Sequence, residues 1–231
     1  MAVGAGVRRS GPNGARRGRQ ERARLPPEVA EDLARSGGEA LAHRNARRLQ
    51  EASRAYADEH YVDALRLVEP LARRMVDVAA VRELHGLCLY RLGRWKAAVS
   101  ELTAAEQLSG GVEHHPVLAD CRRALGHHGE VRRLWEELRE GSASAAVVTE
   151  GRIVAAGSLA DQGDLGAAIR LLEQGPVKVR KPRLHHLRLW YALAALHERA
   201  GDVPRARQLY RQVGDADPDF ADVGERLRTL S

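Results

Sequence analysis

Cysteine, aromatic residues and isoleucine are scarce in this sequence of 231 residues, and each shortage excludes a class of protein. Two cysteines, Cys88 and Cys121, cannot build a disulfide framework or a four-thiolate zinc site, and we expect ordinary buried thiols. Aromatic residues make up 4% of the chain, and isoleucine occurs only at Ile153 and Ile169. Because β-branched and aromatic residues favour strands, a core of leucine, valine and alanine favours packed helices.

Long apolar runs and targeting signals are also missing. No apolar run approaches the ~18 residues that a transmembrane helix requires. Residues 1–24 lack the apolar stretch of a secretory signal, and they carry too few apolar residues for the amphipathic helix of a mitochondrial transit peptide. We therefore expect a cytoplasmic protein that makes no membrane contact.

The motifs of common enzymes are absent as well. The sequence contains no GxxxxGK[ST] phosphate loop, no GxGxxG after a strand and no GxSxG nucleophile elbow. Serine, histidine and aspartate occur, but none of them stands in the setting of a catalytic site. We predict that the protein is not an enzyme and that it holds no cofactor.

Adjacent histidines raise the question of a metal site. Neighbouring residues on a helix point about 100° apart, so an adjacent pair does not converge on one ion. No two histidines are spaced i, i+4, and there is no HExxH. We interpret the pairs as solvated histidines of turns and helix starts, and we predict no metal; a metal-dependent enzyme would instead retain its metal through purification. The pairs are His114-His115, His127-His128 and His185-His186.

The formal net charge of +6 lies in one segment. Residues 1–24 contain seven arginines and one acid, whereas the other 207 residues contain 30 basic and 30 acidic side chains. This arm offers almost nothing to bury, so we predict that it is disordered. Arginine- and glycine-rich tails can track phosphate backbones, and a solvated tail is the competing interpretation. The arginines of this possible nucleic-acid-binding arm are Arg8, Arg9, Arg16, Arg17, Arg19, Arg22 and Arg24.

A second basic cluster lies further along the chain. It comprises Lys178, Arg180, Lys181, Arg183 and Arg188 and contains two of the three lysines. We favour a solvated loop for this cluster over a binding site.

Self-similarity with a period near 34 residues is the main signal in the chain. Five fragments share one form, in which a turn residue, a polar residue and a large apolar residue come before a position that is usually alanine. The fragments end at positions spaced 34, 36, 34 and 38 residues apart. These positions are Ala64, Ala98, Leu134, Ala168 and Ala206.

The first half of each unit carries its own small residue, and a glycine separates the halves. The small residues are Ala52, Gly86, Ala156 and Ala194, and the glycines are Gly93, Gly129, Gly163 and Gly201. Small residues let two helices cross closely, and glycine ends the first helix in a left-handed cap. With two helices per unit, the pattern over about residues 45–231 resembles the tetratricopeptide repeat (TPR).

Two units depart from this pattern. In the third unit, Arg122 and Leu134 stand where small residues are expected. In the first unit, Glu59 replaces the turn glycine. We therefore expect these two units to follow the repeat least closely.

A closer resemblance is to an actinobacterial TPR protein of unassigned activity that also begins with an Arg/Gly-rich segment. This resemblance indicates a group of proteins but implies no biochemical function. It is carried by the runs Val81-Arg82-Glu83, Ala119-Asp120-Cys121-Arg122-Arg123-Ala124-Leu125-Gly126 and Arg152-Ile153-Val154-Ala155-Ala156-Gly157.

The TPR resemblance implies an all-α fold, a right-handed solenoid of about five helical hairpins with an extra N-terminal helix and a C-terminal capping helix. We divide the chain into a disordered basic arm at 1–24, an N-terminal helical segment at 25–44 and a repeat array at 45–231. The units are expected near residues 45–78, 79–114, 115–148, 149–186 and 187–220, with a cap at 221–231.

The resemblance also implies a function. First-helix side chains of such arrays line a concave groove that holds a peptide or a partner helix. The matching positions here combine tyrosine and arginine, as protein hot spots do, although they could merely solvate a helix face. We predict a non-enzymatic protein–protein interaction module or scaffold. The predicted groove residues are Tyr56, Glu83, Tyr90, Arg91, Arg123, His127, Asp161, Arg188, Tyr191 and Arg199.

The alternative is an RNA- or ribosome-associated factor that binds through the basic arm. Such a contact should weaken steeply with salt and should vanish when residues 1–24 are deleted. No change on deletion would exclude it.

Overall fold

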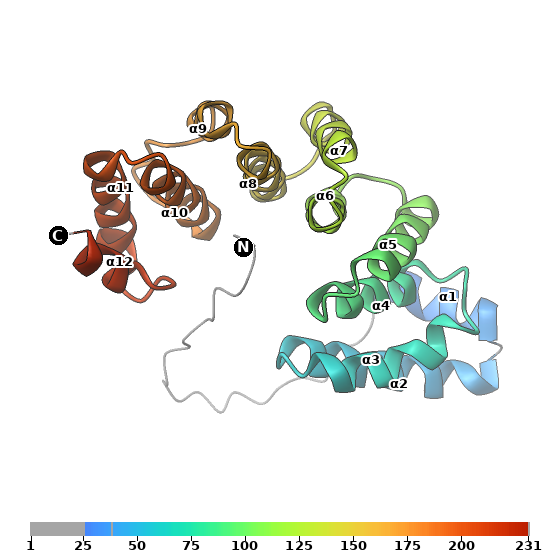
Figure 1. Cartoon of the computed structure of the whole chain (residues 1–231). Helices are drawn as coiled ribbons and strands as arrows, with labels where there is room; N and C mark the ends of the chain where they lie inside the picture. Colours follow the sequence, from blue (N-terminus) through green and yellow to red (C-terminus); the bar gives the residue numbers. More distant parts are fainter. Residues whose placement is uncertain (1–25, 38, 231) are drawn as a thin grey trace. The chain divides into compact units, whose positions relative to one another are not determined.

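The computed structural model describes residues 26–37 and 39–230, and within these ranges the regular structure is entirely α-helical (Figure 1). The predicted all-α class is therefore confirmed. The arginines of the predicted arm lie outside the described residues. The helices are α1 (Pro27–Gly37), α2 (Glu39–Ala57), α3 (Tyr61–Ala72), α4 (Ala79–Arg91), α5 (Trp95–Ser109), α6 (His115–Ala124), α7 (His128–Glu140), α8 (Ala145–Asp161), α9 (Leu165–Glu173), α10 (Leu184–Arg199), α11 (Val203–Ala216) and α12 (Val223–Thr229).

The described helices fall into two compact units, which meet in sequence between Leu125 and Gly126. In the first unit, α1 packs on α2, and the helices from α2 to α6 each pack on the next one along the chain. In the second unit, α7 packs on α8, α8 on both α9 and α10, and α10 on α11. The division falls inside the predicted third unit, whose boundaries stay a prediction.

Four of the hairpins are joined by the same turn. After the last turn of the first helix, one residue adopts a positive φ, and the next N–H returns to a carbonyl five residues back. In α4–α5, for example, Gly93 has a φ of 73° and the Arg94 N–H donates to the Leu89 carbonyl at 2.9 Å. The left-handed residues of the four turns are Glu59, Gly93, Gly163 and Gly201.

The small residues predicted for the helix crossings are buried. In the first unit, Ala52, Ala64 and Ala98 are fully inaccessible to solvent. The closest approach is at Gly86, where an added Cβ would lie 2.7 Å from Cγ of Leu102. Their counterparts in the second unit, also buried, are Ala156, Ala168, Ala194 and Ala206.

The third hairpin corrects the sequence interpretation. Its left-handed glycine is Gly126, with a φ of 76°, whereas Gly129 lies inside α7. A helix end needs its left-handed residue directly after the C-cap, and Gly126 follows the C-cap residue Leu125. When the repeat positions of this hairpin are moved back by three residues, Ala119 and Val131 replace Arg122 and Leu134 at the helix-crossing positions. Both Ala119 and Val131 are buried.

The extra helices predicted at both ends are present. In the first unit, α1 buries Leu33 completely while it packs on α2. In the second unit, α12 packs on α11 and buries Val223, next to the buried Phe220. Both helices therefore cover apolar surface that the neighbouring hairpin would otherwise expose.

Candidate protein-binding surfaces

The predicted groove residues divide between the two units, and we describe them as two surfaces. The first surface comprises Tyr56, Glu83, Tyr90, Arg91 and Arg123. The second surface comprises Asp161, Arg188, Tyr191 and Arg199. His127 was predicted on a first helix, but α6 already ends at Ala124 and His127 is the N-cap residue of α7. The shifted register of the third hairpin explains this correction.

An aromatic–arginine cluster lies on the first surface. The rings of Tyr56 and Tyr61 meet edge to face, with centroids 5.3 Å apart. The guanidinium carbon of Arg91 lies 4.4 Å from the centroid of the Tyr61 ring, within cation–π range. Burial raises the pKa of Tyr56, an effect that nearby Arg91 opposes. Both rings are half-buried and Arg91 is exposed, so the cluster presents an ordered, partly apolar patch to solvent.

Sequence reasoning omitted Tyr61 from this cluster because it begins a second helix. The signal was nevertheless present, since Tyr61 occupies the large apolar position two residues after the turn residue Glu59. Its ring faces the first helices because the Glu59 turn directs the start of α3 back toward α2.

Tyr90 and Arg123 form a polar link between first helices. The Tyr90 hydroxyl donates to Oδ2 of Asp120 at 2.8 Å, joining α4 to α6. Nη1 of Arg123 lies 3.6 Å from Oδ1 of the same carboxylate, and its side chain is only 8% exposed. Burial, followed by the Asp120 charge and hydrogen bond, raises the pKa of Tyr90 strongly. These side chains hold neighbouring helices together and leave little surface for a partner.

Histidines in the first unit pair with glutamates. Nε2 of His114 lies 3.9 Å from Oε1 of Glu83, a groove residue. Nδ1 of His115 lies 2.9 Å from Oε1 of Glu106, and His115 is buried. The interpretation of the histidine pairs as solvated is therefore wrong for His115, because its ring packs at the start of α6.

The other histidine pairs are also tied to the fold. Nδ1 of His128 lies 2.8 Å from the Ser158 hydroxyl, which links α7 to α8. Nδ1 of His186 accepts the backbone N–H of Arg183 at 2.8 Å, in the first turn of α10. Both imidazoles are half-buried.

The second surface is more exposed. Nη2 of Arg188 lies 2.7 Å from Oε2 of Glu150, an ion pair between α10 and α8. Burial raises the pKa of Glu150, although Arg188 opposes the shift. Nη2 of Arg199 donates to the Ala160 carbonyl at 3.2 Å, beside exposed Asp161 at the end of α8. Arginines of α10 therefore bridge to α8 while keeping part of their surface in solvent.

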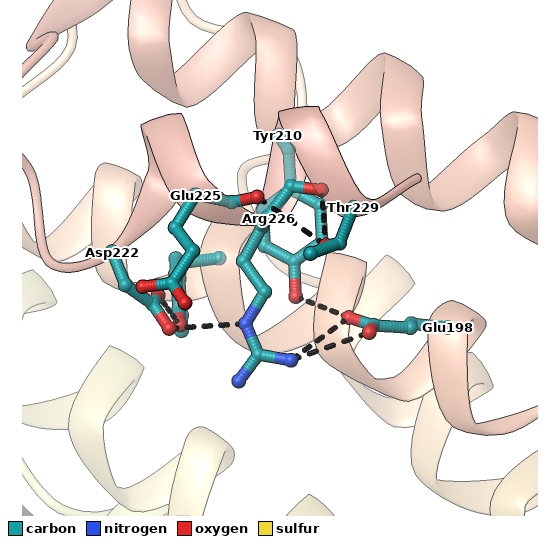
Figure 2. A network of polar contacts seen from close by, with 7 residues as sticks. Glu198, Tyr210, Asp222, Glu225, Arg226 and Thr229 are labelled. Atoms are coloured by element: carbon teal, nitrogen blue, oxygen red, sulfur yellow. Dashed lines mark hydrogen bonds and ion pairs between the residues drawn. The ribbon is translucent and has the colours of Figure 1, made fainter. Parts of the chain in front are cut away.

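Tyr191 belongs to a polar network that fixes the last helix. Figure 2 shows Arg226 of α12 between Asp222 and Glu198, with Nε 3.1 Å from Asp222 and Nη1 3.2 Å from Glu198. Glu198 also accepts the hydroxyl of fully buried Tyr210 at 2.9 Å. The Tyr191 hydroxyl donates to Asp222. The network thus joins α10, α11 and α12.

The same residues are packed by their rings. Tyr191 lies 5.4 Å from Tyr210 and 5.8 Å from Phe220, between ring centroids. Burial and the hydrogen bond to Asp222 raise the pKa of Tyr191 to about 12, and burial with the Glu198 hydrogen bond raises that of Tyr210 further. Among the predicted groove residues, Tyr191 is therefore a structural residue.

A recurring arginine escaped the sequence analysis. Nε of Arg48 donates to the Leu67 carbonyl at 2.8 Å, and Nη1 of Arg152 donates to the Leu171 carbonyl at 3.0 Å. At the same position, Nη1 of Arg82 lies 2.7 Å from Oε2 of Glu101. Each arginine stands four residues before the first-helix small residue and reaches 19 residues ahead, onto the second helix. The sequence signal for these arginines was their constant position, four residues before the small residue of the first helix.

The described residues offer no set of three or more metal-ligating side chains. Cys88 and Cys121 are both fully buried, as predicted, and burial raises their thiol pKa values to about 11 and about 12. Such thiols stay protonated and unreactive at neutral pH. Within the part of the chain that the structure covers, no helix is both long and apolar enough to cross a membrane.

Comparisons with known proteins agree with this architecture in part of the chain. Residues 159–228 match the family described as tetratricopeptide repeat. Among solved structures, the crystal structure of the P58(IPK) TPR domain is 17% identical, covers 89% of this chain and 69% of that chain, and superposes with a TM-score of 0.38. No curated protein sequence gives a significant match. The repeat assignment thus has family support from the end of α8 into α12.

Proposed function

We propose that this protein is a non-enzymatic interaction module or scaffold, which binds a protein partner through the exposed face of its first helices. The tetratricopeptide match over residues 159–228 supports this class of function. The partner's identity is not part of the proposal. The proposal includes a cytoplasmic location and no membrane contact.

The aromatic–arginine cluster is the observation that carries the proposal. Tyrosine and arginine are enriched in protein hot spots, and a tyrosine ring buries a large area at a low conformational-entropy cost. Arg91 is already ordered by the Tyr61 ring, so binding would fix few additional rotamers. The cluster therefore combines apolar area, positive charge and pre-organisation in one patch of the first unit.

The second surface, which belongs to the other unit, would offer charged side chains for a contact of its own. Arg188 and Arg199 each keep part of the guanidinium in solvent, and Asp161 adds a negative charge. We leave Tyr90, Arg123 and Tyr191 out of the proposed contact residues, because their polar groups already bind within the fold. Truncating any of these three side chains would break a contact within the fold, so a loss of binding could follow from a loss of stability.

Affinity capture from native cells tests the proposal with a matched pair of variants. Arg91→Glu reverses the charge of the cluster, whereas Arg66→Glu reverses an exposed arginine on α3 that forms an ion pair with Asp63 of the same helix. A partner that is retained by Arg66→Glu and lost by Arg91→Glu supports the proposal. Equal retention by both variants would contradict it.

The same experiment addresses the basic arm. Capture with and without nuclease, using the full chain and a form without residues 1–24, separates a protein contact from a nucleic-acid contact. A partner that survives nuclease and the deletion binds the helical units. A partner lost in both treatments would indicate the alternative RNA- or ribosome-associated function instead.

A further inference from the structure

Positive charge is concentrated in one segment of the second unit. Residues 174–197 contain five basic side chains and no acidic one. The other 183 residues of the range 25–231 carry 25 basic and 30 acidic side chains, a net charge of −5. The neutral balance of residues 25–231 therefore hides a local charge of +5 between α9 and α10.

The connection between α9 and α10 is extended, and its side chains alternate. Val177 and Val179 are half-buried against the apolar core of the second unit. Lys178 and Arg180 lie between and after them and are exposed. Successive side chains of an extended chain point to opposite sides, so the inward valines direct the two cations outward. Lys181 and Arg183 are also exposed, but the chain bends at residues 180 and 181, so they add charge next to the two outward cations without continuing the alternation.

The backbone of this connection is anchored to the helices. The Trp190 indole Nε1–H donates to the Pro176 carbonyl at 3.2 Å. The Gln212 amide of α11 donates to the Val177 carbonyl at 3.0 Å. The backbone that leads into the cations is thus anchored before any ligand arrives, which lowers the entropic cost of ordering the connection on binding.

The cations of the connection are uncompensated. Among residues that the structure describes, no acidic side chain forms an ion pair with Lys178, Arg180, Lys181 or Arg183. Arg188, by contrast, forms an ion pair with Glu150 at 2.7 Å. The four free cations, and not Arg188, define what we call the basic segment, residues 178–183.

A pair of imidazoles in contact, tilted by 41° to each other, follows the basic segment. The rings of His185 and His186 are 4.0 Å apart between centroids. His186 is fixed by its hydrogen bond from the Arg183 N–H. Burial and the neighbouring positive groups lower the pKa of His185, so the ring is mostly neutral at pH 7. A neutral, half-buried ring beside a row of cations is a surface on which a base can stack.

We propose that the basic segment binds the phosphate backbone of a single-stranded nucleic acid, with the His185 ring stacking on a base. The segment is neither a helix nor a two-stranded ribbon, so it does not fit the element that enters a duplex major groove. An acidic peptide would satisfy the cations but would leave the His185 ring without a stacking partner. This site is independent of the protein-binding surface proposed above.

Fluorescence anisotropy of the full chain with a labelled oligouridylate of about twelve nucleotides tests the site. The variant replaces Lys178, Arg180, Lys181 and Arg183 by glutamine. Each phosphate contact on a single strand contributes about 0.7 to the slope of log K against log salt, so the slope should fall by about 3 between about 50 and about 200 mM salt. At about 100 mM salt the affinity should fall more than about tenfold.

A matched variant separates the site from general charge. It replaces four exposed cations on helices or helix starts, Arg94, Lys96, Arg132 and Arg170, by glutamine and so changes the net charge equally. Its affinity should stay within about twofold of the parent. Equal loss in both variants, or no loss in the first, would overturn the proposal, provided that both keep the parent's circular dichroism spectrum.

The stacking contact has its own test. His185→Ala should weaken oligouridylate binding by about fivefold while leaving the salt slope unchanged. An oligoglutamate peptide of equal length serves as the competing anion. If that peptide binds as tightly as the oligouridylate and His185→Ala has no effect, the segment is a site for acidic peptides and the proposal is wrong.

Discussion

A single residue with a positive φ ends the first helix of each regular hairpin. In three of these turns that residue is glycine, which adopts the left-handed region without a Cβ clash. In the first hairpin it is Glu59, with a φ of 63°. The hydrogen bond from the His60 N–H to the Ala55 carbonyl, at 2.8 Å, matches those of the glycine turns. The surrounding helices therefore impose the turn on a residue that does not favour it.

Glu59→Gly should stabilise the protein by about 0.5–1 kcal/mol, because it removes left-handed strain at some cost in unfolded-state entropy. Urea unfolding monitored by circular dichroism measures the change as a higher midpoint with an unchanged slope. Glu59→Ala is the control, since alanine keeps the Cβ and should leave the midpoint unchanged. A lower midpoint for Glu59→Gly would show that the glutamate side chain itself stabilises the turn.

The hydrogen-bond partners of Tyr90 and Tyr191 could not be predicted from the repeat pattern. The sequence placed Tyr90 and Tyr191 on first helices, and that placement is confirmed. It could not show that their hydroxyls are bound by Asp120 of α6 and by Asp222, the N-cap residue of α12, which follow 30 and 31 residues later. A repeat pattern gives the face of a helix, but the polar partner on the next helix depends on the packing of both.

The third hairpin is the most informative of the helical elements. Gly126 and Gly129 lie three residues apart, and either could end α6 by the residue pattern alone. The structure chooses Gly126, so α7 begins at His128 and its burial pattern shifts by nearly one turn. The apparent exceptions Arg122 and Leu134 then cease to be exceptions, because Ala119 and Val131 take the crossing positions.

A pair of alanine substitutions tests this register. Gly126→Ala should destabilise the protein by about 1 kcal/mol, because alanine disfavours a φ of 76°. Gly129→Ala should stabilise it by up to about 1 kcal/mol, because Gly129 is helical and a Cβ there would meet no neighbour within 4 Å. Thermal unfolding of the two variants compares them directly. Stabilisation by Gly126→Ala together with destabilisation by Gly129→Ala would instead support Gly129 as the turn residue, as expected from the sequence.

Most helices could be predicted from the sequence because two local signals agree on them. Small residues fix where helices cross, and a turn glycine fixes where the first helix stops. Where only one signal is clear, as around Gly126, the prediction slips by three residues. The C-terminal network around Arg226 had one local signal, the i, i+4 spacing of Asp222 and Arg226. Its other partners, Glu198 and Tyr210, lie on α10 and α11 and gave none.

At the scale of the whole molecule, buried tyrosines couple stability to alkaline pH. Burial raises the pKa of Tyr56 and Tyr90 in the first unit and of Tyr191 and Tyr210 in the second. A raised folded-state pKa means that the folded protein keeps its proton where the unfolded chain loses it. The stabilisation is therefore complete below about pH 10 and is lost as the pH rises toward and beyond about 12.

The midpoint of urea unfolding should thus begin to fall near pH 9, where the unfolded thiols of Cys88 and Cys121 ionise and the buried thiols do not. The fall should become steeper above about pH 10, where the tyrosines add to it. Each such tyrosine contributes at most about 1.4 kcal/mol per pH unit, and half-buried Tyr191 contributes less. Tyr191→Phe should make the alkaline fall shallower, because phenylalanine has no hydroxyl to titrate. A fall of equal steepness in Tyr191→Phe would show that this tyrosine does not titrate on unfolding.

The distribution of charge along the chain distinguishes the two proposed kinds of contact. The surplus of +6 belongs to residues 1–24, and the rest of the chain is balanced overall although it contains a local basic segment. Protein recognition is proposed for a mixed surface of tyrosine and arginine, whereas polyanion binding is proposed for a row of free cations. Salt should therefore affect the two kinds of binding differently.

The proposed protein-binding surface is tested most directly by the affinity of a captured partner for two variants, measured by isothermal titration calorimetry. Arg91→Glu should weaken binding by about tenfold or more, because it breaks the cation–π contact with Tyr61 and reverses the charge of the cluster. Arg66→Glu, on the opposite helix of the hairpin formed by α2 and α3, should bind within about twofold of the parent. An unchanged dissociation constant for Arg91→Glu would contradict the proposal.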